Sequence, residues 1–375
     1  MKVLQIANDY FNTKLYDSLF SALGEIGVNN AIFVPVQQNR RHRESDEENR
    51  NDDPSLIVSP CFTRLDRFVY FSKQKKMVTA IEEITDLKSV CCTHAHTLFS
   101  AGYTSMKIME KYGIPYIVAV RNTDVNVFFK RMKHLQRTGI EILKKASMIV
   151  FLSLAYKKQV MEKYVPNSIR DEIESKCKVI PNGISGVFLN NLGDPHDIDR
   201  KNIKLICAGE INKNKNLIET IEAAKILMDK GINVSITAVG DVTDKLCKKW
   251  VDEPMVCHIP RCSQDKLLEY YRKSDIFVMP SHTETFGLVY AEAMSQGLPV
   301  IYTKGQGFDG QFPDGEVGYA VSDRDADKLA DRIIQVADNY EKLSQNAVKG
   351  VERFRWEKIA GEYETMYKMI GLHLV

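Results

Sequence analysis

Residues 280–300 read PSHTETFGLVYAEAMSQGLPV, and this stretch decides how the second half of the chain folds. The apolar run before it, 275–280, predicts a short buried strand, and residues 298–302 predict the next one. Between them a helical pattern begins near Leu288. The stretch is therefore predicted to form a strand, loop, helix and strand, the unit from which parallel sheets are built.

Two glutamates, Glu284 and Glu292, lie eight residues apart across the start of this helix. Eight residues is just over two helical turns, so an acid at the mouth of the helix and one behind it on the same face can address a single ligand. The helix N-terminus supplies free N–H groups and positive dipole, which suit a diphosphate, and leaves sugar hydroxyls to the acids. Two glutamates alone would be read as favourable dipole placement, but the whole unit favours ligand binding.

The length and composition indicate a two-domain globular protein. The chain has 375 residues, with 44% apolar and 27% charged residues, and exceeds what one core usually holds. No apolar run approaches the roughly 18 to 20 residues that span a bilayer, and MKVLQIAND enters a strand at once. Eight cysteines without a CxxC pair read as reduced core fillers. We expect a cytoplasmic protein that can contact the inner face of the cell membrane.

Both halves alternate strand-like and amphipathic segments, which predicts two doubly wound parallel sheets. In the first half the predicted strands are 3–7, 31–34, 89–93, 116–120, 148–151 and 178–180, and helices are predicted at 15–26 and 104–112. In the second half strands at 203–208 and 234–239 precede the two-glutamate unit, and helices are predicted at 217–230, 264–272, 325–337 and through much of 340–370. The carboxyl ends of two such sheets are expected to line a ligand cleft.

Polar stretches divide this pattern. Residues 37–54 hold almost no apolar side chain and predict an exposed, mobile loop. Residues 190–202 predict the linker between the domains. No internal repeat or low-complexity tract is present.

Charge is uneven, since residues 1–190 carry 27 Lys and Arg against 20 Asp and Glu, whereas the remainder carries 24 against 29. Segments 64–76 and 128–137 mix bases with aromatic and aliphatic residues, as interfacial helices on anionic lipid do. A solvated basic helix face over a core stripe is the alternative reading. Nucleic acid is not expected, because no stacking platform or helix-turn-helix pattern accompanies the charge.

Several of these motifs together resemble retaining glycosyltransferases with the GT-B fold, most closely glycosyltransferase family 4, the glycosyl transferases group 1. The likeness is strong over 203–322 and looser before 190, and the turn Pro181-Asn182-Gly183 also matches. It implies an α/β protein with an acceptor-binding Rossmann-like domain at 1–189, a linker at 190–202 and a donor-binding Rossmann-like domain at 203–355. The final segment, 356–375, is expected to pack back onto the first domain as a helix.

The resemblance assigns the donor side residue by residue. Gly209 to Lys215 matches a glycine-to-lysine loop, in which Lys215 contacts the diphosphate. Gly240 lies where the family approaches the base or ribose. Glu292 is expected to bind the ribose hydroxyls and Glu284 to lie near the donor sugar. The amides of Phe286, Gly287 and Leu288 are expected to contact sugar and phosphate.

Two positions depart from the family pattern. Glu210 stands where an arginine usually contacts the diphosphate, and a carboxylate cannot stabilise that leaving group. Lys213 or Arg121 supplies the charge, or activity is reduced. Arg121 itself stands where the family has a histidine near the donor sugar. It either pairs with a uronic acid carboxylate or replaces the cation lost at Glu210.

The acceptor side is assigned to the first domain. Asn8, Tyr10 and Lys14 in the first strand-to-helix loop, together with His96 and Asp124, are the candidate acceptor residues. Cys91, Cys92, His94 and His96 are not expected to share a metal ion, because neighbours on a strand point to opposite faces.

The implied chemistry is a metal-free front-face displacement without a cofactor, in which Glu284, Lys215 and Arg121 are the candidate catalytic residues. The expected partners are a UDP-linked nucleotide sugar, a saccharide or lipid-linked acceptor, and an anionic membrane. Synthesis of a bacterial surface polysaccharide such as capsule fits these partners. The alternatives are a nucleotide-sugar epimerase on the same fold and a non-catalytic nucleotide-sugar binder, which the departures at Glu210 and Arg121 would favour.

Overall fold

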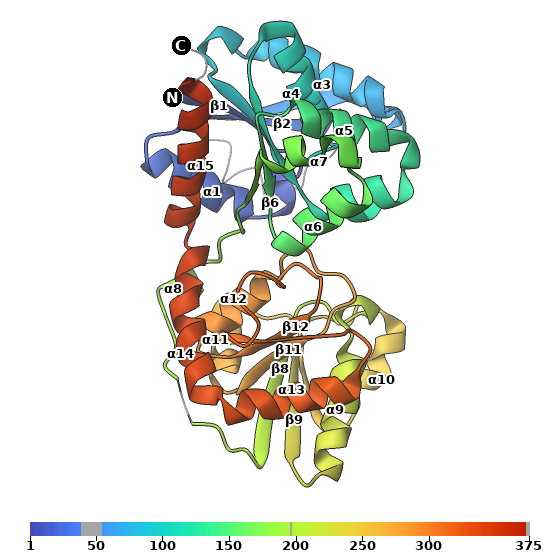
Figure 1. Ribbon diagram of the computed structural model, residues 1–375, viewed down its shortest axis with the longest axis vertical. Coiled ribbons are helices and arrows are strands. Elements are labelled where there is room, and N and C mark those ends of the chain that lie inside the picture. Colours follow the sequence, from blue (N-terminus) through green and yellow to red (C-terminus); the bar gives the residue numbers. More distant parts are fainter. Residues whose placement is uncertain (39–54, 196, 373–375) are drawn as a thin grey trace. The chain divides into compact units, whose positions relative to one another are not determined.

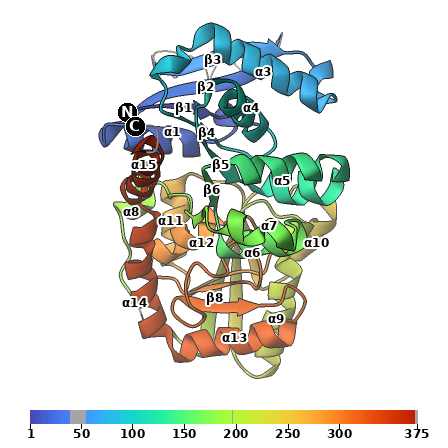
Figure 2. The ribbon, with the colours of Figure 1, turned by 45° about the horizontal axis from the view of Figure 1, so that its top comes forward.

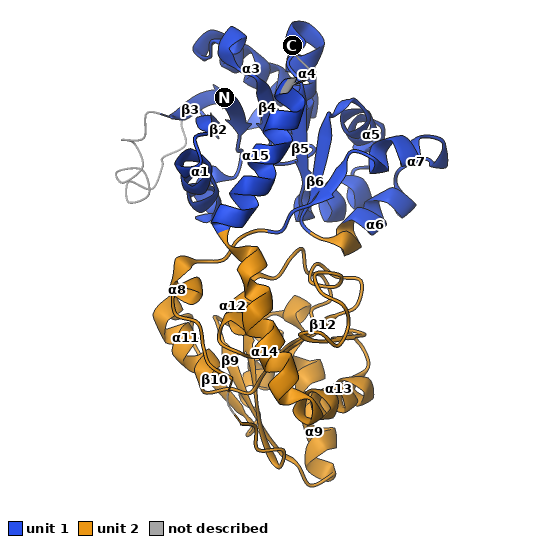
Figure 3. Cartoon of the chain, turned by 60° about the vertical axis from the view of Figure 1, so that its left-hand side comes forward, with its two compact units in different colours: residues 1–152, 157–181, 356–375 blue, residues 153–156, 182–355 orange. Residues whose placement is uncertain are grey.

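The computed structural model describes residues 1–38, 55–195 and 197–372. All but the first two residues of the predicted loop at 37–54 lie outside this part. The chain divides into two compact units (Figure 3). Unit 1 comprises residues 1–152, 157–181 and 356–375, and unit 2 comprises residues 153–156 and 182–355. The last helix of the chain therefore belongs to unit 1, and the predicted linker at 190–202 falls within unit 2.

Unit 1 is built on a seven-stranded parallel sheet in the order β3-β2-β1-β4-β5-β6-β7 (Figure 1). The strands are β1 (Lys2–Ile6), β2 (Asn29–Gln37), β3 (Leu56–Phe62), β4 (Cys92–Ala95), β5 (Tyr116–Val120), β6 (Met148–Phe151) and β7 (Cys177–Val179). The central strands are apolar on both faces, as β5 with its five buried residues shows. Such strands require helices on both sides of the sheet.

The helices of unit 1 cover both faces. Ile117 and Ala119 of β5 share a core with α1 (Leu15–Glu25) and α15 (Trp356–Leu372). Val118 points the other way, toward Gly102 at the start of α4 (Gly102–Tyr112) and Ile142 of α5 (Gln136–Lys145). Beside α4, α3 (Tyr70–Ile84) packs along β3 (Figure 2). The remaining helices are α6 (Leu154–Lys163), whose residues from 157 onward belong to unit 1, α7 (Asn167–Glu174) and a π-helical turn, η4 (Asp124–Phe129).

Unit 2 is built on a six-stranded parallel sheet in the order β10-β9-β8-β11-β12-β13. The strands are β8 (Asn202–Ala208), β9 (Asn233–Val239), β10 (Val256–Ile259), β11 (Ile276–Met279), β12 (Val300–Thr303) and β13 (Gly318–Val321). Ile276 and Val278 of β11 join a core that includes residues of α9 (Leu217–Asp229) and α13 (Ala326–Asp338).

The other face of this sheet is covered by a second helix layer. Phe277 packs against Tyr271 of α11 (Gln264–Arg272) and Tyr290 of α12 (Leu288–Ser295). Next to α12 lies α14 (Tyr340–Gly350), and two short helices, α8 (Gly186–Leu189) and α10 (Lys248–Val251), complete the unit.

The predicted fold class is confirmed: each unit is a parallel sheet between helix layers. Three strands were not predicted, namely β3, β10 and β13, and the strand predicted at 89–93 lies at Cys92–Ala95. The strand, helix and strand predicted around the two glutamates are present as β11, α12 and β12.

Candidate functional site

The candidate site of unit 2 lies where adjacent parallel strands end. Loops leave the carboxyl ends of β8, β11, β12 and β13, which are neighbours in the sheet. Parallel strands end at one edge, so these four loops meet there. They carry Lys215, Glu284 and Gln306.

An ion pair joins two of these loops. Lys215 Nζ lies 2.6 Å from Glu284 Oε2, and the two side chains are 26% and 13% exposed. Partial burial strengthens such a contact relative to a surface pair. Because an ammonium group has three donors, Lys215 can hold Glu284 and still donate to a ligand oxygen.

Asn214 fixes the neighbourhood of this ion pair. Its Nδ2 donates to the carbonyl of Thr283 at 2.8 Å, and its Oδ1 accepts from the amide of Thr283 at 3.0 Å. Its own carbonyl accepts from the amide of His282. The loop before Lys215 and the loop before Glu284 are thus held together by three hydrogen bonds beside the ion pair.

Gln306 supports Glu284 from the other side. Its Oε1 accepts from the amide of Glu284 at 3.0 Å, and the amide of Gly307 donates to the carbonyl of Glu284. A Cβ on Gly307 would lie 1.9 Å from the carbonyl oxygen of Thr285, so this approach requires glycine. Glu284 is therefore fixed by two loops before any ligand binds.

Gly209 and Gly240 press together at the ends of β8 and β9. Gly240 has a φ of +144°, and a Cβ there would lie 1.9 Å from the carbonyl oxygen of Gly209. The imidazole of His258 donates from Nε2 to the carbonyl of Gly240 at 2.8 Å. Beside this pair Glu210 is exposed, and Lys213 is also exposed, with its Nζ 3.9 Å from Asp244.

The start of α12 is shaped by three of the predicted donor residues. Gly287 has a φ of +76° and precedes the helix, which begins at Leu288 without a side-chain cap. Its first amides are thus left to other acceptors. The Phe286 ring is buried against Phe354, so this residue can offer a ligand its backbone only.

Glu292 lies in α12 and is buried. Burial raises the pKa of its carboxyl group to about 7, and the nearby Tyr271 hydroxyl opposes that rise. A buried carboxylate seeks hydrogen-bond donors. Hydroxyl groups of a bound ligand would favour its ionised form.

A second acid–base pair was not predicted. His282 Nδ1 lies 2.6 Å from Asp323 Oδ2, in the loops after β11 and β13. Asn216, with a φ of +56°, donates from Nδ2 to the carbonyls of Pro280 and Asp323. Asparagine tolerates the left-handed region. Asn216 could therefore have been predicted from the sequence as the residue that precedes α9 in this conformation.

In unit 1, Asn8, His96 and Arg121 follow β1, β4 and β5, which are neighbours in the sheet. Arg121 Nε donates to the carbonyl of His96 at 3.1 Å. The buried Asp124 carboxylate accepts from the amide of Arg121, and from those of two residues before α4, Leu98 and Phe99. Burial raises the pKa of Asp124 to about 6, against these hydrogen bonds.

The other acceptor candidates differ in accessibility. His96 is buried, with Nε2 2.9 Å from Gln5 Oε1, and burial holds the pKa of its ring well below the usual value. Tyr10 is buried in the core beside α1. Asn8 is half-buried and donates to the carbonyl of Ser100, whereas Lys14 is exposed.

Three of these side chains, Tyr10, His96 and Asp124, are thus occupied by protein contacts. We do not carry them forward as direct acceptor contacts. Asn8 and Lys14 are the acceptor candidates that remain accessible at this edge, where the half-buried Arg121, a catalytic candidate, also lies.

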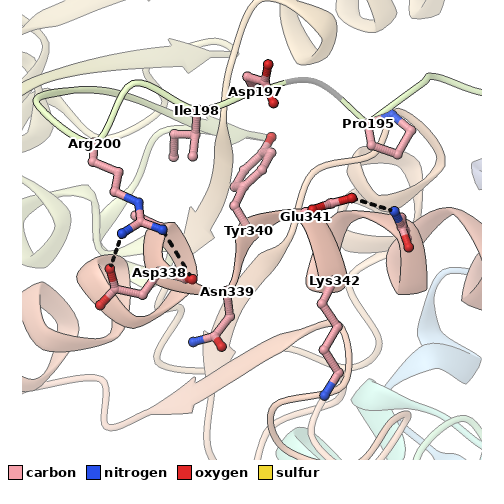
Figure 4. Close-up of a pocket in the computed structure, with 11 residues that line it drawn as sticks. Pro195, Asp197, Ile198, Arg200, Asp338, Asn339, Tyr340, Glu341 and Lys342 are labelled. Atoms are coloured by element: carbon pink, nitrogen blue, oxygen red, sulfur yellow. Dashed lines mark hydrogen bonds and ion pairs between the residues drawn. The ribbon is translucent and has the colours of Figure 1, made fainter.

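A separate hollow of about 790 Å³ lies at the other edge of the unit 2 sheet (Figure 4). Arg200, just before β8, pairs with Asp338 at the end of α13 at 3.1 Å. Helix α13 runs back from the carboxyl edge, so this hollow is remote from Glu284 along the strands.

Within the described residues, no three His, Cys, Asp or Glu side chains gather as a metal ion would require. In the same residues no helix is long and apolar enough to span a bilayer.

Comparison with known proteins identifies a family for the part of the chain that carries this site. The sequence model described as "Glycosyl transferases group 1" matches residues 191–352, which include the loops of Lys215 and Glu284. This part of the chain belongs to that family. The match covers less than half of the chain, and the relatives extend the likeness to the remainder.

The relatives extend over much of the chain. An uncharacterised glycosyltransferase of Methanocaldococcus jannaschii is 26% identical over 77% of this chain and 78% of its own. The alpha-monoglucosyldiacylglycerol synthase of Acholeplasma laidlawii is 26% identical over 84% of both. HepE of Anabaena, solved in complex with UDP, superposes with a TM-score of 0.72 at 15% identity, over 98% of this chain and 100% of that one. The fold of this chain is the GT-B fold.

Proposed function

We propose that this glycosyltransferase transfers a sugar from a nucleotide-diphosphate sugar, UDP-linked, to a saccharide or lipid-linked saccharide, with retention of configuration and without a metal ion or cofactor. The ion pair of Lys215 and Glu284 beside the start of α12 carries the proposal. It supplies one fixed cation and one fixed acid where free helix amides can meet a diphosphate.

Each group has a part in this proposal. Lys215 and the first amides of α12 stabilise the charge that develops on the diphosphate as the bond from the anomeric carbon to the phosphate oxygen breaks. The acceptor oxygen forms its bond to the same carbon from the same face, and its proton passes to the departing diphosphate oxygen. Glu284 orients the sugar, and Glu292 binds the ribose hydroxyls.

The relatives support the two substrate classes. HepE was solved with UDP, and the Acholeplasma relative is named for a glycolipid product. A lipid-linked acceptor of a surface polysaccharide or a glycolipid is therefore the class we propose.

A non-catalytic nucleotide-sugar binder is the second candidate, because Glu210 stands exposed beside Gly209, where the family has a cation. The two are separated by incubating the protein with a panel of neutral and uronic UDP-sugars and measuring nucleotide release and product by mass spectrometry. Turnover supports the transferase. Tight donor binding with no release of UDP from any sugar would support the non-catalytic binder.

The same panel tests Arg121. If its guanidinium pairs with a uronic carboxylate, Arg121→Ala loses activity with uronic donors more than with neutral ones. Equal loss with both classes would assign it to the diphosphate. An unchanged preference for neutral donors in the variant would exclude the uronic interpretation.

A further inference from the structure

The segment from η2 (Leu65–Arg67) into α3 exposes its apolar side chains. Leu65 is 76% exposed, Phe68 83%, Val69 57% and Phe71 51%. Single exposed apolar residues are ordinary, but four within seven consecutive residues mark an interaction surface.

The polar side chains of the same segment point inward. The Asp66 carboxylate accepts hydrogen bonds from Thr63, Ser72 and Lys76. The Tyr70 hydroxyl donates to the carbonyl of Phe99. Gln74 Nε2 donates to the carbonyls of Phe99 and Ser100. A surface helix normally turns its apolar side chains inward and its polar side chains to water. Here the hydrogen bonds hold the polar side chains inward, and the apolar side chains are therefore exposed.

Bases surround the apolar side chains. Arg64 and Lys75 are exposed on the segment itself. A groove of about 650 Å³ begins at Phe71, and its lining includes Lys75 as well as Lys107 and Lys111, which pair with Glu110 and Glu82. Bases beside exposed phenylalanines suit a surface that is apolar within and anionic at its boundary.

The second basic segment adjoins the first. The rings of Tyr70 and Phe128 lie 6.4 Å apart, and Phe128 stacks on Phe99 at 4.7 Å. Phe128 leads into residues 130–137, whose exposed bases include Lys130, Arg131, Lys133 and Arg137. The two segments singled out in the sequence therefore adjoin through Tyr70 and Phe128. We name their exposed apolar and basic side chains together the α3 face: Arg64, Leu65, Phe68, Val69, Phe71, Lys75, Lys130, Arg131, Lys133 and Arg137.

We propose that the α3 face docks onto the surface of an anionic lipid bilayer. Its four apolar side chains enter the boundary between headgroups and acyl chains, and its bases contact lipid phosphates. Docking does not depend on the proposed function, but its use does. Asn8 and Gln74 donate to the same carbonyl, that of Ser100, so the face adjoins the edge assigned to the acceptor. A lipid-linked acceptor would then reach that edge from the bilayer.

The test is co-sedimentation of the full chain with vesicles of phosphatidylcholine alone or with one third phosphatidylglycerol. The expected result is binding to the anionic vesicles that weakens with salt. Phe68→Ser with Phe71→Ser should lower the partition coefficient at least about tenfold. The matched control is Leu246→Ser with Met228→Ser, two residues of unit 2 that are 60% and 44% exposed. It should bind as the unchanged protein does.

Charge is tested separately. Lys130→Gln with Arg131→Gln should weaken binding about fivefold for each base removed, whereas Lys248→Gln with Lys249→Gln, exposed lysines of unit 2, should not. Equal binding by the Phe68/Phe71 variant and its control would overturn the proposal. So would a dimer in sedimentation velocity that this variant converts to monomer, since a second copy would then cover the face. UDP release from the nucleotide sugar without vesicles, measured on the same variants, tests the proposed function independently.

Discussion

The carboxyl edges of the two sheets use polar side chains for opposite purposes. In unit 2 the charged groups Lys215 and Glu284 are partly exposed, and neutral side chains such as Asn214 hold them in place. In unit 1 the charged Asp124 is itself buried and holds loops, while the accessible surface nearby is apolar and basic. A charged donor requires preorganised ionic groups, which the edge of unit 2 supplies. In our proposal the acceptor is carried by a lipid, and the α3 face is the part of unit 1 that would place it at a membrane.

The largest expected effect tests the ionic side of this comparison. Lys215→Ala removes the fixed cation and leaves Glu284 without it, so kcat/KM for transfer should fall by about 10² to 10³. The measurement is initial rate against nucleotide-sugar concentration. Lys225→Ala, which removes an ion-paired lysine from α9, is the matched control and should stay within about twofold.

A residual activity within threefold of the unchanged enzyme in Lys215→Ala would break the comparison. The diphosphate would then be stabilised elsewhere, and unit 2 would hold the ion pair for structure only.

The next effect concerns positioning. Asn214→Leu keeps the size of the side chain but removes both hydrogen bonds to Thr283, so Lys215 and Glu284 lose their common support. A displacement of about 1 Å can cost about 10²-fold, and we expect a loss of about 10 to 10² in kcat. Asn233→Leu, at an exposed asparagine pair, is the control. If Asn214→Leu changed only the unfolding temperature, Asn214 would support the fold and not the reaction.

The sequence predicted the parts of this molecule that depend on local pattern. Helix α11 lies where it was predicted, and β5 and β12 follow from apolar runs. Strands β10 and β13 are as short as β12, but His258 interrupts the apolar run of β10 and Gly318 opens β13, so neither pattern stood out from loops.

The candidate site was only partly predictable, because some of its residues act through contacts that no local pattern shows. The register of Lys215 with Glu284 followed from the family pattern, but Asn214 and Gln306 act through contacts 69 and 22 residues away. His96 at a strand end has the sequence features of a site residue. Its partner Gln5, 91 residues away, makes it part of the core, and no local pattern shows that.

A change of pH sharpens the comparison, because burial raises the pKa of Glu292 to about 7. If the carboxylate binds ribose hydroxyls, UDP affinity should fall toward about tenfold per pH unit as the pH drops below 7. Glu292→Gln should bind UDP more weakly at pH 8 and with little pH dependence. Titration calorimetry from pH 5.5 to 8.5 measures both, with Glu269→Gln, an exposed acid of α11, as the control.

The raised pKa of Glu292 predicts the opposite effect on stability: Glu292→Gln should weaken UDP binding at pH 8 but stabilise the fold. A raised folded pKa contributes stability below the ordinary value of 4.5, and this is lost as the pH rises through 7. Glu292→Gln should therefore raise the free energy of unfolding at pH 8, by about 2 kcal/mol. A variant less stable at pH 8 would show that Glu292 is held ionised by protein donors.

The smallest effect concerns the polar groups buried in unit 1. The Tyr367 hydroxyl of α15 lies 2.8 Å from His94 Nδ1 and accepts from Gln5 Nε2 at 3.3 Å. Tyr367→Phe removes the partner of His94 Nδ1 and one of the two acceptors of Gln5 Nε2, which also donates to Asn30 Oδ1. This loss in the core should cost about 1 to 3 kcal/mol and lower Tm by several degrees. Tyr112→Phe, at a side chain that is 44% exposed, should lower Tm by less. Because the network ties α15 to β1 and β4, the loss should appear in Tm, with kcat/KM at 25 °C within about twofold. A variant with normal Tm but impaired transfer would instead make this network part of the acceptor site, and the contrast between the two edges would no longer hold.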